Sequence, residues 1–177
     1  MSKPAIPRGF TIVELIIVIV IIGILATIAI VSYGGIQNRA YTSSVKQTLR
    51  DNFNKIQEYK TINGGYPTNE TDLGTINFKI AKSSFDITLN NSFLYCYYTD
   101  NSNAALLGRV KGTGANYAYN ALGGLIEMAG WGSSTQERCN YAFGETGANF
   151  TGKGFSVGVW NQSPNIWKSW PGPGQGE

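Results

Sequence analysis

Near its start, the chain places a glycine–phenylalanine pair and a single carboxylate beside a long apolar run. Gly9 and Phe10 precede the run, and Glu14 interrupts it close to its beginning. A carboxylate within a membrane helix costs about 2.5–3.5 kcal/mol on insertion scales, so it usually has a partner or a task. Glu14 therefore predicts charge pairing inside an apolar surrounding. The alternative is a carboxylate that lies near the membrane interface and reaches water.

The residues around Glu14 indicate the element that positions it. No formally charged residue occurs from Leu15 to Asn38, and as a helix this stretch would be about 36 Å long. A bilayer core is about 30 Å thick, and backbone in lipid must satisfy its own hydrogen bonds, so we expect a membrane-spanning helix. Lys3 and Arg8 precede the helix and favour an orientation with the N-terminus inside.

The position of Gly9 distinguishes this segment from an ordinary secretory signal. Such a signal has a shorter apolar core and a small-residue cleavage site after that core. Here the apolar run is longer and the glycine lies before it. Cleavage beside Gly9 would therefore keep the hydrophobic helix in the mature chain.

A short basic leader followed by Gly9, Phe10, Thr11, Glu14 and the apolar run resembles the class III leader of type IV pilins and related pseudopilins. The resemblance covers about thirty residues at the N-terminus. It implies that a prepilin peptidase cuts between Gly9 and Phe10, and that the new amine on Phe10 is then N-methylated. It also implies that Glu14 pairs with the Phe10 amine of a neighbouring subunit and so sets the register of a filament.

The composition excludes several classes of function. The 177 residues contain no histidine, which removes the commonest general base and the commonest metal ligand. We therefore expect no enzyme, no cofactor and no metal site. The oxygen-rich run Asp100–Asn103 lacks the ordered carboxylates of a calcium loop and predicts a turn. The net charge of +3 falls to +1 when Lys3 and Arg8 leave with the leader, and no block of like charge supports nucleic acid as a partner.

After the membrane run, the helical pattern continues with one apolar face. Apolar residues recur there at spacings near four, namely Ile36, Ala40, Val45, Leu49, Phe53 and Ile56. No proline occurs between Pro7 and Pro67, and Gly64 with Pro67 forms a stop signal. We therefore expect one helix from about Phe10 to about Thr61. A membrane anchor followed by a separate linker is the alternative, although no linker composition appears.

Beyond the helix, alternating and aromatic-rich stretches separated by turn residues predict four strands, at about 85–89, 93–99, 104–111 and 116–122. Short turns between them favour an antiparallel meander whose apolar face packs on the helix. Residues 76–80 also alternate without a clear state, and the stretch around Val157 predicts a further strand. The fold class is therefore α+β. The resemblance implies the type IV pilin fold, in which a long N-terminal helix packs its C-terminal half on the meander.

These patterns divide the chain into five segments. They are a leader peptide at 1–9, a hydrophobic transmembrane and filament-core helix at 10–33, an amphipathic continuation at 34–62, a β-rich head domain at 63–170 and a flexible tail at 171–177.

The two cysteines, Cys96 and Cys139, lie in the expected head domain. Export to an oxidising compartment favours a disulfide between them. Pilins commonly bridge two cysteines near the C-terminal end of this domain, although Cys96 lies earlier in the sequence than that arrangement implies. Two unpaired buried thiols are the alternative.

The leading hypothesis is a structural subunit of a type IV pilus. Such a subunit is stored in the cytoplasmic membrane, extracted by inner-membrane assembly machinery and polymerised into a helical homopolymer at the cell surface. Adhesion, twitching motility and DNA uptake share this architecture. A type II secretion pseudopilin is the first alternative, favoured by Tyr66-Pro67 after the helix. An alternative of another class is a single-pass, membrane-anchored module that binds surface glycans through Trp160, Trp167 and Trp170.

Overall fold

The computed structural model describes residues 9–86, 88, 92–145, 152–161 and 166–169. The chain forms two compact units, Met1–Gln37 and Asn38–Glu177. We call the described residues of the first unit the apolar unit and those of the second the head. Helix α1 (Ile12–Asn63) contributes to both units. The prediction of one helix from about Phe10 to about Thr61 is therefore confirmed, with each end displaced by two residues.

The apolar unit consists of the first part of α1 and the residues that precede it. Every residue from Ile12 to Ile30 is exposed, and this part of the helix is long and apolar enough to cross a membrane. The hydroxyl of Thr27 donates a 2.9 Å hydrogen bond to the carbonyl of Gly23. This polar side chain is thus satisfied within its own helix, as an apolar surrounding requires.

The C-terminal end of α1 follows from a glycine in a left-handed conformation. Gly64 has φ of +78°, and its N–H donates to the carbonyl of Lys60 at 2.8 Å. This geometry satisfies one of the last helical carbonyls, and a side chain at this position would be strained. The stop signal that Gly64 and Pro67 form in the sequence is therefore confirmed.

The head contains a six-stranded antiparallel sheet with the strand order β4-β3-β2-β1-β5-β6. Strands β1 to β4 form a consecutive meander, and β5 pairs with the other side of β1. The bounds are β1 (Phe93–Tyr98), β2 (Ala104–Arg109), β3 (Asn116–Asn120), β4 (Gly124–Glu127), β5 (Gly152–Asn161) and β6 (Ile166–Ser169). The predicted meander is confirmed, as is the further strand around Val157.

One predicted strand of the meander is wrong in the part that the structure describes. Of the stretch 85–89, residues 85, 86 and 88 are described and form no strand, and Phe85 makes an isolated bridge to Val110. The carboxylate of Asp86 accepts hydrogen bonds from the backbone N–H and the hydroxyl of Thr88, at 3.1 and 2.5 Å. This local turn competes with a strand for the backbone. The fourth strand of the meander is β4 instead, and residues 76–80 form no strand.

Three short helical segments interrupt the expected β-rich region. They are α2 (Glu70–Thr75), the 3₁₀ turn η1 (Lys82–Ser84) and α3 (Thr135–Ala142). Side chains cap both α-helices. Asn69 accepts from the N–H of Asp72, and Ser134 accepts from the N–H of Glu137. Such caps satisfy N–H groups that have no partner inside the helix.

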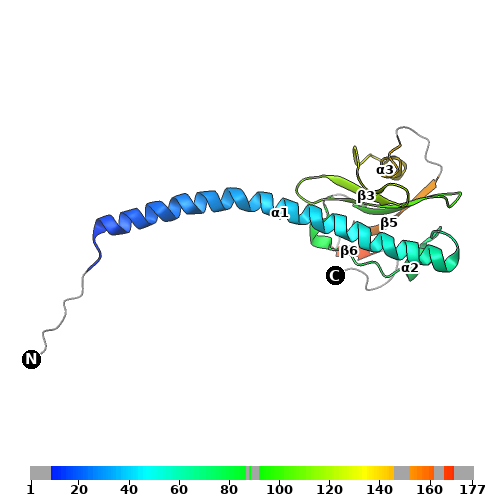
Figure 1. Cartoon of the computed structure of the whole chain (residues 1–177), viewed down its shortest axis with the longest axis horizontal. Coiled ribbons are helices and arrows are strands. Elements are labelled where there is room, and N and C mark those ends of the chain that lie inside the picture. The colour runs from blue at the N-terminus through cyan, green and yellow to red at the C-terminus, as the bar shows by residue number, and fades with distance from the viewer. Residues whose placement is uncertain (1–8, 87, 89–91, 146–151, 162–165, 170–177) are drawn as a thin grey trace, which may run out of the picture. The chain divides into compact units, whose positions relative to one another are not determined.

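Both faces of strands β1 to β3 are buried, so this part of the head has three layers (Figure 1). On β1, Phe93, Tyr95 and Tyr97 pack toward α1, and the alternate residues Leu94 and Cys96 pack toward α3. The residues of α1 that join the first core are Val45, Leu49, Phe53 and Ile56. Ile36 and Ala40, the first residues of the predicted apolar face, are exposed. The buried face of α1 therefore begins at Val45.

Two asparagine side chains hold the connection between α1 and the sheet. The buried amide of Asn52 donates to the carbonyl of Lys79 at 2.7 Å and accepts from the Lys79 N–H at 2.8 Å. Asn101 accepts from the Tyr66 N–H at 2.6 Å and donates to the Tyr66 carbonyl at 3.1 Å. Each amide thus binds both the backbone N–H and the backbone carbonyl of one residue between α1 and the sheet, as a neighbouring strand would do.

Replacing Asn52 with leucine is expected to lower the free energy of unfolding of the head by about 1–3 kcal/mol. The change removes both hydrogen bonds to the backbone of Lys79, which are part-buried, and each such bond contributes about 0.5–1.5 kcal/mol. Denaturant unfolding of the full chain in detergent, followed by near-UV circular dichroism, measures the loss. The exposed neighbour Asn54 provides the control, because Asn54→Leu should change stability by less than about 0.5 kcal/mol. Equal effects of the two substitutions would contradict the role given to Asn52.

Candidate functional site

The residues singled out near the N-terminus lie together at the start of α1. Thr11 immediately precedes the helix, which begins at Ile12. Oε2 of Glu14 accepts hydrogen bonds from the backbone N–H of Thr11 at 2.8 Å and from its hydroxyl at 2.7 Å. In return, the Glu14 N–H donates to Oγ1 of Thr11 at 3.2 Å. Thr11 and Glu14 therefore form a reciprocal capping box.

This capping box determines where the Glu14 carboxylate lies. The carboxylate is held one helical turn back from its own position, beside the backbone of Thr11. Both contacts fall on Oε2, so the other carboxylate oxygen, Oε1, is not used by the cap. The helix dipole also favours a negative charge at this end. Thr11 is part of the sequence motif, but its role as a cap was not predicted, although the Thr-x-x-Glu spacing is its signal.

Gly9 and Phe10 lie in the irregular stretch before the capping box. Phe10 is 86% exposed, and a Cβ added to Gly9 would meet no atom within 4 Å. The peptide bond between these two residues is therefore accessible in the described structure. The structure places Gly9, Phe10 and Glu14 within one short segment, as the sequence led us to expect.

The helix after the capping box presents apolar side chains on all sides. Fourteen large apolar residues from Ile12 to Ile30 are exposed, most of them by half or more. A helix that is apolar all round requires burial in a membrane or in the core of an assembly. None of these residues is buried within the apolar unit itself, so this unit needs an apolar surrounding.

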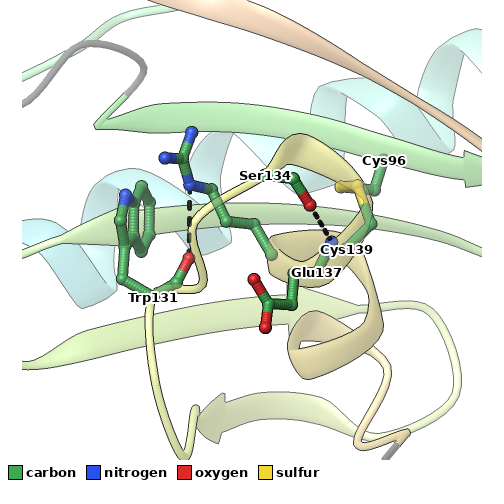
Figure 2. Close-up of a disulfide and its surroundings, with 6 residues drawn as sticks. Cys96, Trp131, Ser134, Glu137 and Cys139 are labelled. Atoms are coloured by element: carbon green, nitrogen blue, oxygen red, sulfur yellow. Dashed lines mark hydrogen bonds between the residues drawn. A yellow bond between two sulfur atoms is a disulfide. The ribbon is translucent and has the colours of Figure 1, made fainter. Parts of the chain in front are cut away.

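The second predicted pair, Cys96 and Cys139, forms a disulfide between β1 and α3 (Figure 2). Both cysteines are fully buried, and their Cα atoms are 5.7 Å apart. The alternative of two unpaired thiols is therefore wrong. The bond fixes α3 to the sheet face opposite α1.

Polar contacts also stabilise the start of α3, which lies on the sheet face opposite α1. The guanidinium of Arg138 lies over the ring of Trp131, and its Nε donates to the Trp131 carbonyl at 3.2 Å. The Glu137 carboxylate accepts from the N–H and hydroxyl of Ser133 at 2.7 and 2.8 Å. These hydrogen bonds favour the charged carboxylate and lower the pKa of Glu137.

The oxygen-rich run at Asp100 forms the predicted turn. The carboxylate of Asp100 accepts from the N–H and the hydroxyl of Ser102, at 2.9 and 2.7 Å. Within the described ranges, no three His, Cys, Asp or Glu side chains come together as metal ligands would. Trp160 and Trp167 belong to β5 and β6. Trp170 and the expected tail at 171–177 lie outside the described residues.

The chain is similar to known proteins at the N-terminal segment and beyond it. A family model for the prokaryotic N-terminal methylation motif matches residues 7–30. A fimbrial protein of Neisseria meningitidis serogroup A is 37% identical over 67 residues, which cover 38% of this chain and 39% of the relative. A type II secretion system core protein G of Dickeya chrysanthemi is 33% identical over 69 residues, covering 39% of this chain and 45% of the relative.

A longer match comes from Thermus thermophilus. Its type IV wide pilus major component PilA4 is 32% identical over 97 residues, which cover 54% of this chain and 74% of the relative. In contrast, the chain spans about two fifths of the length of the Neisseria relatives that it matches. The similarity therefore extends past the apolar helix in the Thermus protein.

Proposed function

Because this chain belongs to the family of type IV pilins and pseudopilins, we propose that it is a structural subunit that polymerises through its apolar unit into a type IV pilus. One observation carries the proposal. The apolar unit is exposed all round, and its one charged side chain, Glu14, is held by Thr11 at the start of the helix. A helix of this kind suits a membrane before assembly and a filament core afterwards.

Processing of the N-terminus is the first step of the proposal. A prepilin peptidase cuts between Gly9 and Phe10, and the amine of Phe10 is then methylated. The match of the methylation-motif model to residues 7–30 supports both reactions. The exposure of Phe10 and the open space around Gly9 support access of the peptidase to this bond.

Assembly is the second step. Before it, the mature chain is anchored in the cytoplasmic membrane with its N-terminus inside, which the basic residues Lys3 and Arg8 of the precursor support. Assembly machinery in that membrane extracts the subunit. The core helix 10–33 is then buried among neighbouring helices, and residues 34–62 carry the head domain 63–170 outward. Inside the filament, Glu14 pairs with the Phe10 amine of an adjacent subunit, since a buried charge without a partner is heavily penalised.

A type II secretion pseudopilin is the second candidate. The 33% identity to the core protein G of Dickeya chrysanthemi supports it, as does the ordered Tyr66-Pro67 segment, where Asn101 binds the Tyr66 backbone. Both candidates share processing and polymerisation. Deleting the retraction motor or the secretion outer-membrane channel in the source cell would separate them, because each deletion should alter filament display in only one case.

The mature N-terminus of the chain in sheared surface filaments tests the proposal. Mass spectrometry is expected to find a chain that begins with N-methylated Phe10. A Gly9→Leu variant is the control: its side chain meets open space, so the fold should persist while cleavage fails and the chain stays in the membrane. An intact Met1 in filaments would overturn the processing step. A chain found only in the membrane fraction would favour the anchored binding module instead.

A further inference from the structure

A shallow cleft, lined by residues with polar or charged side chains, lies on the head beside its first α1 residues. Its volume is about 390 Å³, and it lies between α1 and the turn that joins β2 to β3. The residues that line it are Asn38, Arg39, Thr42, Ser43, Lys46 and Thr113.

The β2–β3 turn forms the cleft by approaching α1 closely. Gly112 has φ of +80°, and a Cβ at this position would lie 2.8 Å from Oδ1 of Asn38. Glycine suits the turn conformation, and its missing Cβ leaves room for the side chain of Asn38 against the turn. Next to it, Oγ1 of Thr113 accepts from the N–H of Ala115 at 3.2 Å, which leaves the hydroxyl proton of Thr113 to donate elsewhere.

The lining has the chemistry of a phosphate site. Arg39 and Lys46 supply two positive charges, and the hydroxyls of Ser43 and Thr113 and the amide of Asn38 supply further hydrogen-bond donors. The hydroxyl of Thr42, also in the lining, donates instead to the carbonyl of Asn38 at 2.9 Å. Nζ of Lys46 lies 4.4 Å from the centre of the Tyr117 ring, which holds this cation beside the cleft. None of the described residues that line the cleft is acidic.

Nearby carboxylates do not offset this positive charge. The sequence from Leu15 to Arg50 contains no acidic residue. Asp86, which follows the 3₁₀ turn beside α1, pairs with Arg109 at 3.1 Å. Burial raises the pKa of Asp86, but hydrogen bonds from Thr88 and Arg109 outweigh it and keep the pKa below its ordinary value. Asp86 is therefore a charged and already compensated group.

Chain connectivity places the cleft near a membrane surface. Asn38, its first residue, is also the last residue of the uncharged stretch that starts at Leu15. As a helix this stretch is about 36 Å long, close to the thickness of a bilayer core. If Glu14 lies at one interface, Arg39 lies at the other, among the lipid headgroups. This step rests on the membrane anchoring of the proposed function.

We infer that the cleft binds the phosphate of an anionic phospholipid headgroup, in the leaflet on the side of the head, while the subunit is stored in the membrane. The lipid phosphate contacts Arg39 and Lys46, and the hydroxyl of Thr113 donates to it. Binding fixes the head against the membrane surface and is lost when the subunit is extracted. A free phosphate ion and an acidic side chain of a second subunit are the competing occupants.

Photo-crosslinking of the full chain in nanodiscs tests this inference. The probe is phosphatidylglycerol with a photoreactive headgroup, present at a low fraction in phosphatidylcholine. Labels are expected on residues 38–46 and on Thr113. The double variant Arg39→Gln/Lys46→Gln should reduce this labelling about thirty-fold, since two cations at an anionic surface are lost.

The matched control is Arg50→Gln/Lys60→Gln. It removes the same charge from the same helix, outside the cleft, and Lys60 lies over the Tyr66 ring at 3.9 Å much as Lys46 lies over Tyr117. This variant should retain full labelling. Equal loss in both variants, or equal labelling by a photoreactive phosphatidylcholine, would overturn the inference.

Competition experiments separate the remaining occupants. Labelling that inorganic phosphate abolishes would assign the cleft to free phosphate and overturn the lipid assignment. Labelling that appears only as subunit-to-subunit crosslinks would assign the cleft to a second copy of the chain and would also overturn the lipid assignment. Because the assay needs only an anchored chain, its failure leaves filament formation untouched. Failure of the chain to insert into nanodiscs would instead contradict the anchoring step of the proposed function.

Discussion

Replacing Glu14 with glutamine is expected to abolish filaments while leaving the chain cleaved at Gly9 and inserted in the membrane. Glutamine keeps a side-chain oxygen that can accept from Thr11, as Oε2 of Glu14 does at 2.7 and 2.8 Å. The substitution thus preserves the cap and removes only the negative charge. In the filament it leaves the Phe10 amine without its partner, and breaking a buried ion pair in this way costs about 3–5 kcal/mol. Such a cost at every subunit addition stops growth.

A Thr11→Val variant supplies the complementary test of Glu14. It removes the hydroxyl of the capping box and keeps the carboxylate. Loss of an N-cap costs about 1 kcal/mol, so filament yield should fall far less than for Glu14→Gln. Electron microscopy and immunoblotting of sheared filaments measure the yield, and mass spectrometry of the membrane fraction confirms cleavage. Normal filaments from Glu14→Gln would refute charge pairing as the basis of register.

Replacing both Cys96 and Cys139 with alanine is expected to lower the free energy of unfolding of the head by about 4 kcal/mol. The disulfide closes a loop with a sequence separation of 43, and the chain-entropy model gives about this value for such a loop. The loss falls mainly on α3, because the disulfide is its covalent link to β1. Denaturant unfolding of the full chain in detergent measures the change.

Two comparisons make the disulfide prediction specific. The parent chain, once unfolded in reductant and refolded, should show the same low stability as the double variant. An Ala129→Gly change, in the irregular stretch before α3, should leave most of the stability in place. A double variant as stable as the parent would show that packing of Met128 and Trp131 against Ala142 already holds α3, and that the disulfide is dispensable.

The long helix and the meander could be read from the sequence because their signals are local. The uncharged run from Leu15, the absence of proline before Pro67 and the glycine at position 64 together define α1. Turn clusters separate β1, β2 and β3. The start of the buried face at Val45 was not predicted, because it depends on where the head begins and not on helical periodicity.

The predictions for the head that were wrong or missing have identifiable physical causes. Residues 85–89 alternate like a strand, but the Asp86 side chain binds Thr88 and Arg109 and ends the pairing after one bridge. Helix α3 is short and largely polar at its start. Its Ser134-x-x-Glu137 spacing is a readable cap signal, but the disulfide and the second core that stabilise it are long-range contacts.

For the N-terminal site, the sequence indicated the participants but not their geometry. Glu14 stood out because a carboxylate in an apolar run is costly. The contribution of Thr11 becomes evident only when the start of the helix is fixed at Ile12, since the same threonine one turn later would only bond its own helix. The pairing of Cys96 with Cys139 was predicted from the number of cysteines and from the oxidising compartment. The attachment of α3 to β1 by this disulfide was not predicted.

The strand order has a consequence for the crowding of heads along a polymer. One border of the sheet is β4, a strand of four residues that ends in the exposed Glu127. A short border strand with a charge offers few free backbone groups to another sheet and repels an identical copy. The opposite border, β6, is equally short. Neighbouring heads can therefore stand close together at high local concentration without fusing into one continuous, amyloid-like sheet.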